Sequence, residues 1–245
     1  MTEADWLTGT DVTAFVRFAA DHLSPRRQRL LATGFCRVVS HLFNHPELNE
    51  KLGVIERYAD GVVSAAEVEK ARQRCRGIAQ ASFDEYRIAV DSRMGDSRRA
   101  YARQEFAWAV AYTPVDPLPL SDVAARAAFA AQYASTETDA VELPGTLVTY
   151  KSPTGELANT MRSVVWEVIG NPFRAVHFKP DWRTDTAKSL ARQMYESREF
   201  SAMPILADAL QDAGCDNEDV LTHCRDTTAK HIRGCWVLDL VLGKE

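Results

Sequence analysis

Residues 24–44, which read SPRRQRLLATGFCRVVSHLFN, decide the fold of this 245-residue chain. Ser24 is a residue type that caps helices, and Pro25 suits the first helical turn because its missing N–H needs no partner there. Apolar residues then recur every three or four positions, which is the spacing of one face of an α-helix. They are Leu30, Leu31, Phe35, Val38, Val39, Leu42 and Phe43. The segment therefore predicts an amphipathic helix that packs against a core.

The same kinds of signal recur along the chain. A helix that begins at Pro46 stops at Gly61, and Ser64 with Glu67 forms a capping box that opens a long helix. Further helices are expected over 97–112, 121–139, 156–169, 185–198, 204–213 and 216–224. Residues 141–153 instead favour a short β-hairpin or an extended loop, because β-favouring residues there are flanked by Pro and Gly. We therefore predict an all-α or nearly all-α protein, a multi-helical bundle or array.

Prolines indicate where the chain divides. Residues 113–120, TPVDPLPL, hold three prolines within six positions, which no helix tolerates. We expect an N-terminal helical subdomain over 1–112, a Pro-rich junction over 113–120 and a C-terminal helical subdomain over 121–245.

Composition and charge favour some partners and compartments over others. The stretch from Lys70 to Arg103 holds nine basic and four acidic residues, but the net charge of −5 makes nucleic-acid binding unlikely. No apolar run reaches the roughly twenty residues that a membrane span needs, so no membrane partner is expected. The acidic start lacks the apolar region of a secretory signal, and five cysteines form no disulfide framework. These observations predict a cytoplasmic protein with reduced thiols.

The C-terminal region gathers most of the residues that could bind a metal. They are Cys215, His223, Cys224, His231 and Cys235. Zinc takes four nitrogen or sulfur ligands, and His231 and Cys235 would lie one turn apart on a helix. No C-x2-C pair is present, and free cysteine is usually a small buried hydrophobe. The sequence therefore favours packed thiols and no cofactor, with a zinc-binding module as the alternative.

Arg225 and His231 suggest a second alternative. Their spacing is compatible with helical, HEPN-like, metal-independent ribonucleases or hydrolases, in which histidine moves a proton and arginine stabilises the phosphorane charge. That site needs one continuous helix, and the intervening Asp226-Thr-Thr is a poor helix interior. Whether the chain is an enzyme is therefore open, and a non-catalytic protein is favoured.

Three other residues are assigned structural roles. Asp239 interrupts an apolar closing segment, predicted as a buried helix or strand, so its carboxylate needs a partner such as Arg174, Arg225 or Arg233. Trp236 is expected to anchor the core. Arg174 follows an Asn-Pro turn and could instead hold a carboxylate or phosphate.

Several segments carry a resemblance to a known family. They are GNPFR at 170–174, LADALQDAGC at 206–215 and HIRGCWVLDLVLGKE at 231–245, with further likeness at 1–7 and 57–61. Together they resemble an uncharacterised bacterial family with many paralogues. The resemblance implies a bacterial source and a loop over 226–230, and it brings no known activity. Because no spacing in the chain matches a catalytic or cofactor motif, we expect a non-catalytic helical interaction or regulatory module with an unidentified protein partner.

Overall fold

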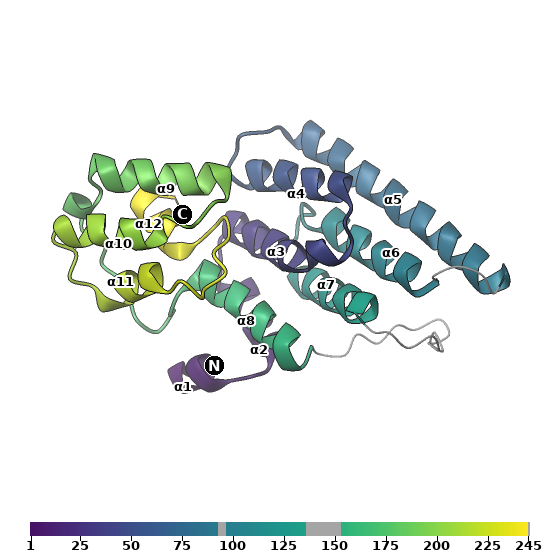
Figure 1. Cartoon of the computed structure of the whole chain (residues 1–245), viewed down its shortest axis with the longest axis horizontal. Coiled ribbons are helices and arrows are strands. Elements are labelled where there is room, and N and C mark those ends of the chain that lie inside the picture. The colour runs from purple at the N-terminus through teal and green to yellow at the C-terminus, as the bar shows by residue number, and fades with distance from the viewer. Residues whose placement is uncertain (93–96, 136–152, 245) are drawn as a thin grey trace. The chain divides into compact units, whose positions relative to one another are not determined.

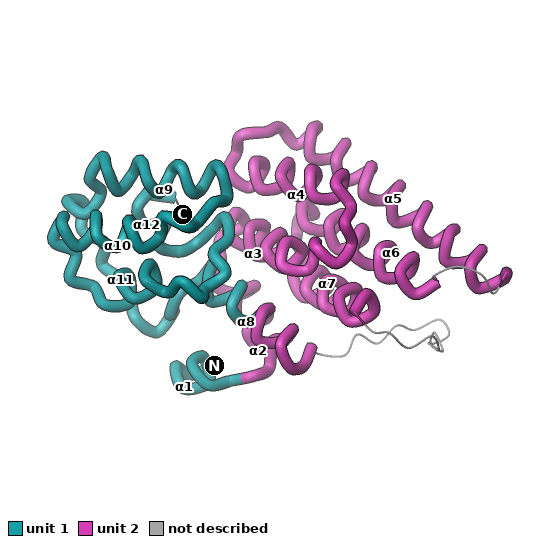
Figure 2. Tube along the Cα trace, viewed as in Figure 1, with its two compact units in different colours: residues 1–9, 162–245 teal, residues 10–161 magenta. Residues whose placement is uncertain are grey.

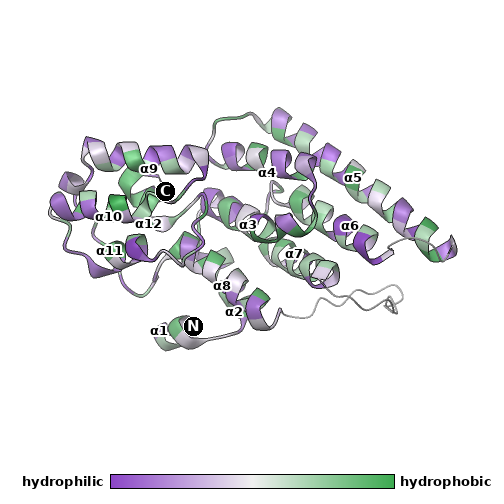
Figure 3. Ribbon diagram, in the orientation of Figure 1, coloured by the Kyte–Doolittle hydropathy of each residue, from purple (hydrophilic) through white to green (hydrophobic). Residues whose placement is uncertain are grey.

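The computed structural model describes residues 1–92, 97–135 and 153–244, and every regular element within them is a helix (Figure 1). This confirms the predicted all-α, multi-helical array. Polar and apolar residues lie on different sides of many of these helices, as amphipathic packing requires (Figure 3). The hairpin or extended loop predicted near 141–153 falls, apart from Pro153, outside the described residues.

The chain forms two compact units (Figure 2). Unit 2 comprises residues 10–161, and unit 1 comprises residues 1–9 together with 162–245. The Pro-rich segment 113–120, predicted as a junction, lies inside unit 2. There it connects α6 (Ser97–Tyr112) to α7 (Leu120–Ser135), which pack against each other, so its prolines turn the chain between neighbours rather than between units. This division differs from the predicted subdomains 1–112 and 121–245.

Unit 2 is built from consecutive helices that pack on one another. They are α2 (Val12–His22), α3 (Pro25–Val39), η1 (Ser40–Leu42), α4 (Pro46–Ala59), α5 (Ala65–Ser92), α6 (Ser97–Tyr112), α7 (Leu120–Ser135) and the first part of α8 (Gly155–Ile169). Unit 1 contains the last part of α8 and the shorter helices of both ends. These are α1 (Glu3–Thr8), η2 (Pro180–Trp182), α9 (Asp185–Ser197), α10 (Met203–Asp212), α11 (Glu218–Arg225) and α12 (Trp236–Leu242).

Local sequence signals set several helix ends as predicted. Pro25 is the first residue of α3, and the Ser24 hydroxyl accepts a hydrogen bond from the Arg27 amide. Ser64 and Glu67 satisfy each other's backbone N–H groups ahead of α5, at 3.0 and 3.3 Å. Gly61, after α4, has a φ of +71°, which glycine adopts without strain. These ends depend only on neighbouring residues, so the sequence alone predicts them.

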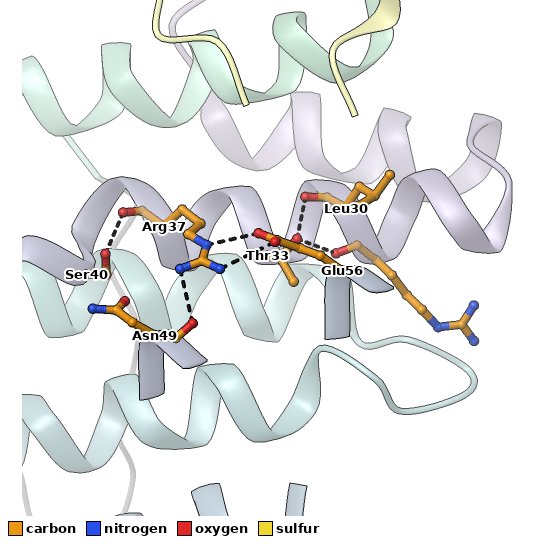
Figure 4. Close-up of polar contacts among 7 residues, drawn as sticks. Leu30, Thr33, Arg37, Ser40, Asn49 and Glu56 are labelled. Carbon is orange, nitrogen blue, oxygen red and sulfur yellow. Dashed lines mark hydrogen bonds and ion pairs between the residues drawn. The ribbon is translucent and has the colours of Figure 1, made fainter. Parts of the chain in front are cut away.

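A buried ion pair joins α3 to α4 within unit 2 (Figure 4). The Arg37 guanidinium donates from Nε to Glu56 Oε1 at 2.9 Å and from Nη1 to the Asn49 carbonyl at 3.2 Å. Only 3% of the Glu56 side chain is exposed. A carboxylate so far from water needs a charged, hydrogen-bonded partner, so Arg37 makes its burial tolerable.

The arginines of the basic stretch are largely engaged within the chain. Arg72 pairs with Glu69 at 3.1 Å on α5, Arg74 pairs with Glu47 of α4, and Arg103 of α6 pairs with Glu85. The excess positive charge predicted for Lys70 to Arg103 is therefore partly neutralised by these acidic neighbours. Separately, no described helix is both long enough and apolar enough to cross a bilayer.

The Arg37–Glu56 pair predicts a large difference between two arginine substitutions. Arg37→Ala removes the Arg37 cation from beside the buried Glu56 carboxylate, so the free energy of unfolding should fall by about 3 kcal/mol. Arg74→Ala breaks an exposed pair and should cost much less, because water already screens that pair. Urea denaturation followed by circular dichroism measures both. Equal losses in the two variants would contradict the buried role of Arg37.

Candidate metal centre

Unit 1 has its own apolar core, formed by α9 to α12. Each of these helices contributes a residue that is essentially inaccessible to solvent: Met194, Leu206, Val220 and Leu238. The closing segment, predicted as a helix or a strand, is the helix α12, and Trp236 at its start is 9% exposed within this core. Trp236 thus has the anchoring position expected of it, and α12 closes the unit.

The end of α8 lies directly against α12. Gly170 follows α8 with a φ of +72°, and a Cβ placed on it would lie 3.0 Å from Cδ2 of Trp236. A glycine is required here for two reasons, because the backbone is left-handed and the indole leaves no room for a side chain. This close approach brings the last turn of α8 next to the start of α12, where Cys235 is the N-cap.

The helix α11 and the loop after it bring two histidines to the same place. Asn217 caps α11, and its side chain accepts from the Val220 amide at 3.0 Å. His223 lies in the last turn of α11, which ends at Arg225. The chain after α11 is a loop, and the loop that the resemblance implies over 226–230 lies within it. His231 also lies in this loop.

Four side chains of unit 1 converge: Glu167, His223, His231 and Cys235. Nδ1 of His231 lies 2.9 Å from Oε1 of Glu167. Nε2 of His223 lies 3.5 Å from Oε2 of Glu167 and 3.2 Å from Sγ of Cys235. One donor atom from each residue lies within 4.8 Å of all the others. The group therefore offers two nitrogens, one sulfur and one oxygen around a common point.

Some of these distances approach the size of a tetrahedral metal site. Zinc binds nitrogen and oxygen at about 2.1 Å and sulfur at about 2.3 Å, so the edges of the tetrahedron are about 3.4 Å or slightly longer. Three separations, 2.9, 3.2 and 3.5 Å, are near that edge, but the first and the last involve different oxygens of Glu167. The four donor atoms lie within 4.8 Å of one another, so they would have to move closer together to surround an ion.

The electrostatics of the group are those of a buried, self-paired cluster. Burial alone would raise the pKa of Glu167, but hydrogen bonds from His223 and His231 outweigh it and hold that pKa below its usual value. Burial and the Glu167 carboxylate raise the pKa of the Cys235 thiol well above its ordinary value. Without a cation, Cys235 is thus a protonated thiol and a poor nucleophile.

One buried atom of His231 bears on whether a metal ion fits. Nε2 of His231 is buried and has no hydrogen-bond partner within the described residues, although only 5% of this side chain is exposed. In the hydrogen-bonded cluster, Nδ1 must carry the proton that faces Glu167, since an ionised carboxylate only accepts. A cation between the two would replace that proton, but the ring proton would then lie on Nε2, which is buried without a partner in the described residues, so this atom does not favour an ion at Nδ1.

The structure brings together only part of the predicted ligand set. His223, His231 and Cys235 converge, whereas Cys215 and Cys224 lie in the apolar core, where burial raises the pKa of Cys224 to about 12. Glu167 was not predicted, because it lies far from the C-terminal cluster in sequence. Its signal was an acidic residue within the apolar run VVWEVI of α8, where a buried carboxylate requires a partner.

The geometry does not assemble the catalytic alternatives. The ribonuclease-like spacing needs Arg225 and His231 on one helix, but α11 ends at Arg225, whose guanidinium binds Gln211 at 2.5 Å. The cluster also lacks the geometry of a Cys–His–acid catalytic triad, because Cys235 and Glu167 both approach Nε2 of His223. In such a triad, the acid orients the histidine through its second nitrogen.

The other two residues that the sequence analysis singled out, Arg174 and Asp239, lie outside the group of four converging side chains. Arg174 pairs with two carboxylates: its Nε lies 2.6 Å from Oε1 of Glu3, and its Nη1 lies 3.5 Å from Oδ1 of Asp219. These ion pairs attach α1 to the rest of unit 1. Asp239 is 2% exposed on α12. Of its proposed partners, Arg233 lies with its guanidinium carbon 4.4 Å from the centroid of the Tyr195 ring.

The contact between Gly170 and Trp236 yields a stability prediction. Gly170→Ala adds a methyl group against the indole and strains a left-handed backbone, so unfolding should become easier by about 2–4 kcal/mol. Gly214→Ala is the matched control, because its φ is +82° and its Cβ would meet nothing within 4 Å. It should cost about 1–2 kcal/mol. Thermal unfolding of both variants tests this, and a control loss as large as that of Gly170→Ala would contradict the close contact.

Comparisons with protein-family models, with curated proteins and with solved structures found no match to this chain. The assignment of a function therefore depends on the four converging side chains and their surroundings.

Proposed function

We propose that this protein is a non-catalytic helical module whose unit 1 binds one zinc ion. The ligands are Glu167, His223, His231 and Cys235. One observation carries the proposal: four donor atoms of the types that zinc prefers lie within 4.8 Å of one another on α8, α11, the loop after it and the start of α12.

The donor set favours zinc over other common ions. Mg²⁺ and Ca²⁺ take oxygen ligands, so two imidazoles and a thiolate suit them poorly. Soft ions such as Cu⁺ favour sites richer in sulfur than this one. Two nitrogens, one sulfur and one oxygen form the borderline set that Zn²⁺ accepts in four-coordinate sites.

Burial favours a structural role for the ion. Catalytic zinc keeps one position for water or substrate, whereas structural zinc has four protein ligands. Here the protein supplies four donors, and Glu167, His231 and Cys235 are each at most about 5% exposed. The proposal therefore retains the interaction or regulatory module, with a protein partner, that the sequence predicts.

The proposed compartment remains the cytoplasm. Cys36, Cys75, Cys215, Cys224 and Cys235 are all free and buried. Reduced thiols are typical of the cytosol, and a thiolate must stay reduced to bind zinc.

Zinc binding is the first test. Protein purified without a tag should contain close to one zinc per chain by elemental analysis, and chelation should lower the melting temperature. A ligand present at about 100 times its Kd stabilises the folded state by about 2.7 kcal/mol. His231→Gln should lose the zinc, whereas His177→Gln, which alters an exposed histidine of the same unit, should retain it.

The opposite result has a defined meaning. If added zinc changes neither the metal content nor the melting temperature, the four residues form only a buried hydrogen-bonded cluster. Loss of zinc in His177→Gln would likewise show that the ion binds elsewhere.

Cobalt tests the ligand identities. Co²⁺ in the site should give the intense visible absorption of a tetrahedral complex and a thiolate-to-cobalt charge-transfer band. Cys235→Ser should abolish the charge-transfer band, and Cys215→Ser, a cysteine of the same unit outside the cluster, should leave it unchanged. A band that persists in Cys235→Ser would exclude this thiolate as a ligand.

A further inference from the structure

A pocket of about 410 Å³ lies beside the proposed metal centre in unit 1. Its size falls within the range of small-molecule sites, which is roughly 300–1,000 Å³. Much of its wall is apolar, formed by Phe200, Met203, Pro204 and Ala229. The pocket can therefore enclose the apolar body of a small ligand.

One wall of the pocket is formed by the loop that carries the proposed metal ligand His231. This loop, residues 226–234, runs from α11 to Cys235 and carries His231. His231 belongs both to the pocket and to the four converging side chains, and its ring centroid lies 6.1 Å from that of Phe200. An ion bound at His223, His231 and Cys235 would fix the loop at both ends and near its middle.

One residue of this loop places a carboxylate in the pocket, although the loop also carries Lys230 and Arg233. The Asp226 carboxylate lines the pocket, and its Oδ1 accepts from the amide and hydroxyl of Thr228 at 2.9 and 2.6 Å. These hydrogen bonds lower the pKa of Asp226, so it is ionised at neutral pH. A carboxylate has about four lone-pair positions, which leaves it able to accept from a ligand. Unit 1 as a whole carries 11 Lys and Arg against 15 Asp and Glu, which also attracts cations.

We propose that this pocket binds an organic ammonium ion with an apolar body. The apolar body packs against Phe200, Met203 and Pro204, and the ammonium group donates to Asp226. The coupling to metal rests on the proposed function, because the ion positions the loop that carries Asp226 and His231. Binding of the amine should therefore be tighter in the zinc-loaded protein.

A titration with two matched probes tests this site. Phenethylamine and 3-phenylpropanoate share a phenyl ring and a two-carbon stem but carry opposite charges. In amide NMR spectra of the zinc-loaded protein, phenethylamine should shift resonances of residues 200–204 and 226–231 to saturation, and 3-phenylpropanoate should not. Asp226→Asn keeps an oxygen for Thr228 and should weaken phenethylamine about fivefold, the effect of a partly exposed ion pair. Asp208→Asn, an exposed carboxylate of α10, should change nothing.

The outcomes separate the two proposals. Equal binding of the anionic probe, unchanged affinity in Asp226→Asn or no saturable shift overturns the amine site even if zinc is present. Amine binding that depends on Asp226 in a protein without zinc supports the site and removes only its coupling to the metal. Nα-acetyl-lysine amide tests a second source of the ammonium group. If it binds more tightly than phenethylamine, the ligand is a lysine of a protein partner, and weaker binding assigns the site to a free amine.

Discussion

The buried carboxylate of Glu167 is the constraint on which the organisation of unit 1 depends. An ionised carboxylate at 4% exposure is expensive unless cations or hydrogen-bond donors compensate it. Here two imidazoles approach it, at 2.9 and 3.5 Å, from the loop after α11 and from α11 itself. The C-terminal segments must therefore come to α8 for the unit to fold, and the donors that satisfy the carboxylate are also ligands suited to zinc.

The backbone around this carboxylate supports the same arrangement. Gly170 lets the Trp236 ring lie against the chain immediately after α8, and this contact places Cys235 beside the last turn of that helix. The His223 ring lies 5.2 Å from that of Trp236, so the indole also packs against a ligand. Apolar packing and polar pairing thus hold the same three segments together.

Local features of the fold could be predicted from the sequence, and long-range ones could not. Helix starts at Pro25 and Ala65 follow from caps that involve residues three apart. Three of the four candidate ligands were identified because they lie within the short stretch 223–235. Glu167 was missed because its partners lie more than fifty residues away. Unit 1 also includes residues 1–9, and the contacts that hold them, such as Arg162 Nη1 to the Gly9 carbonyl at 2.6 Å, leave no local pattern.

The spacing of the four donors along the chain implies an order of assembly. The entropy lost in closing a loop grows with its length, so His223, His231 and Cys235 can meet at lower cost than any of them can meet Glu167. A C-terminal segment that has already gathered a cation would arrive at α8 carrying a positive charge, and the acidic side chain would complete its coordination last. The carboxylate would then act as a latch, which converts capture of an ion by a short peptide segment into closure of the whole unit.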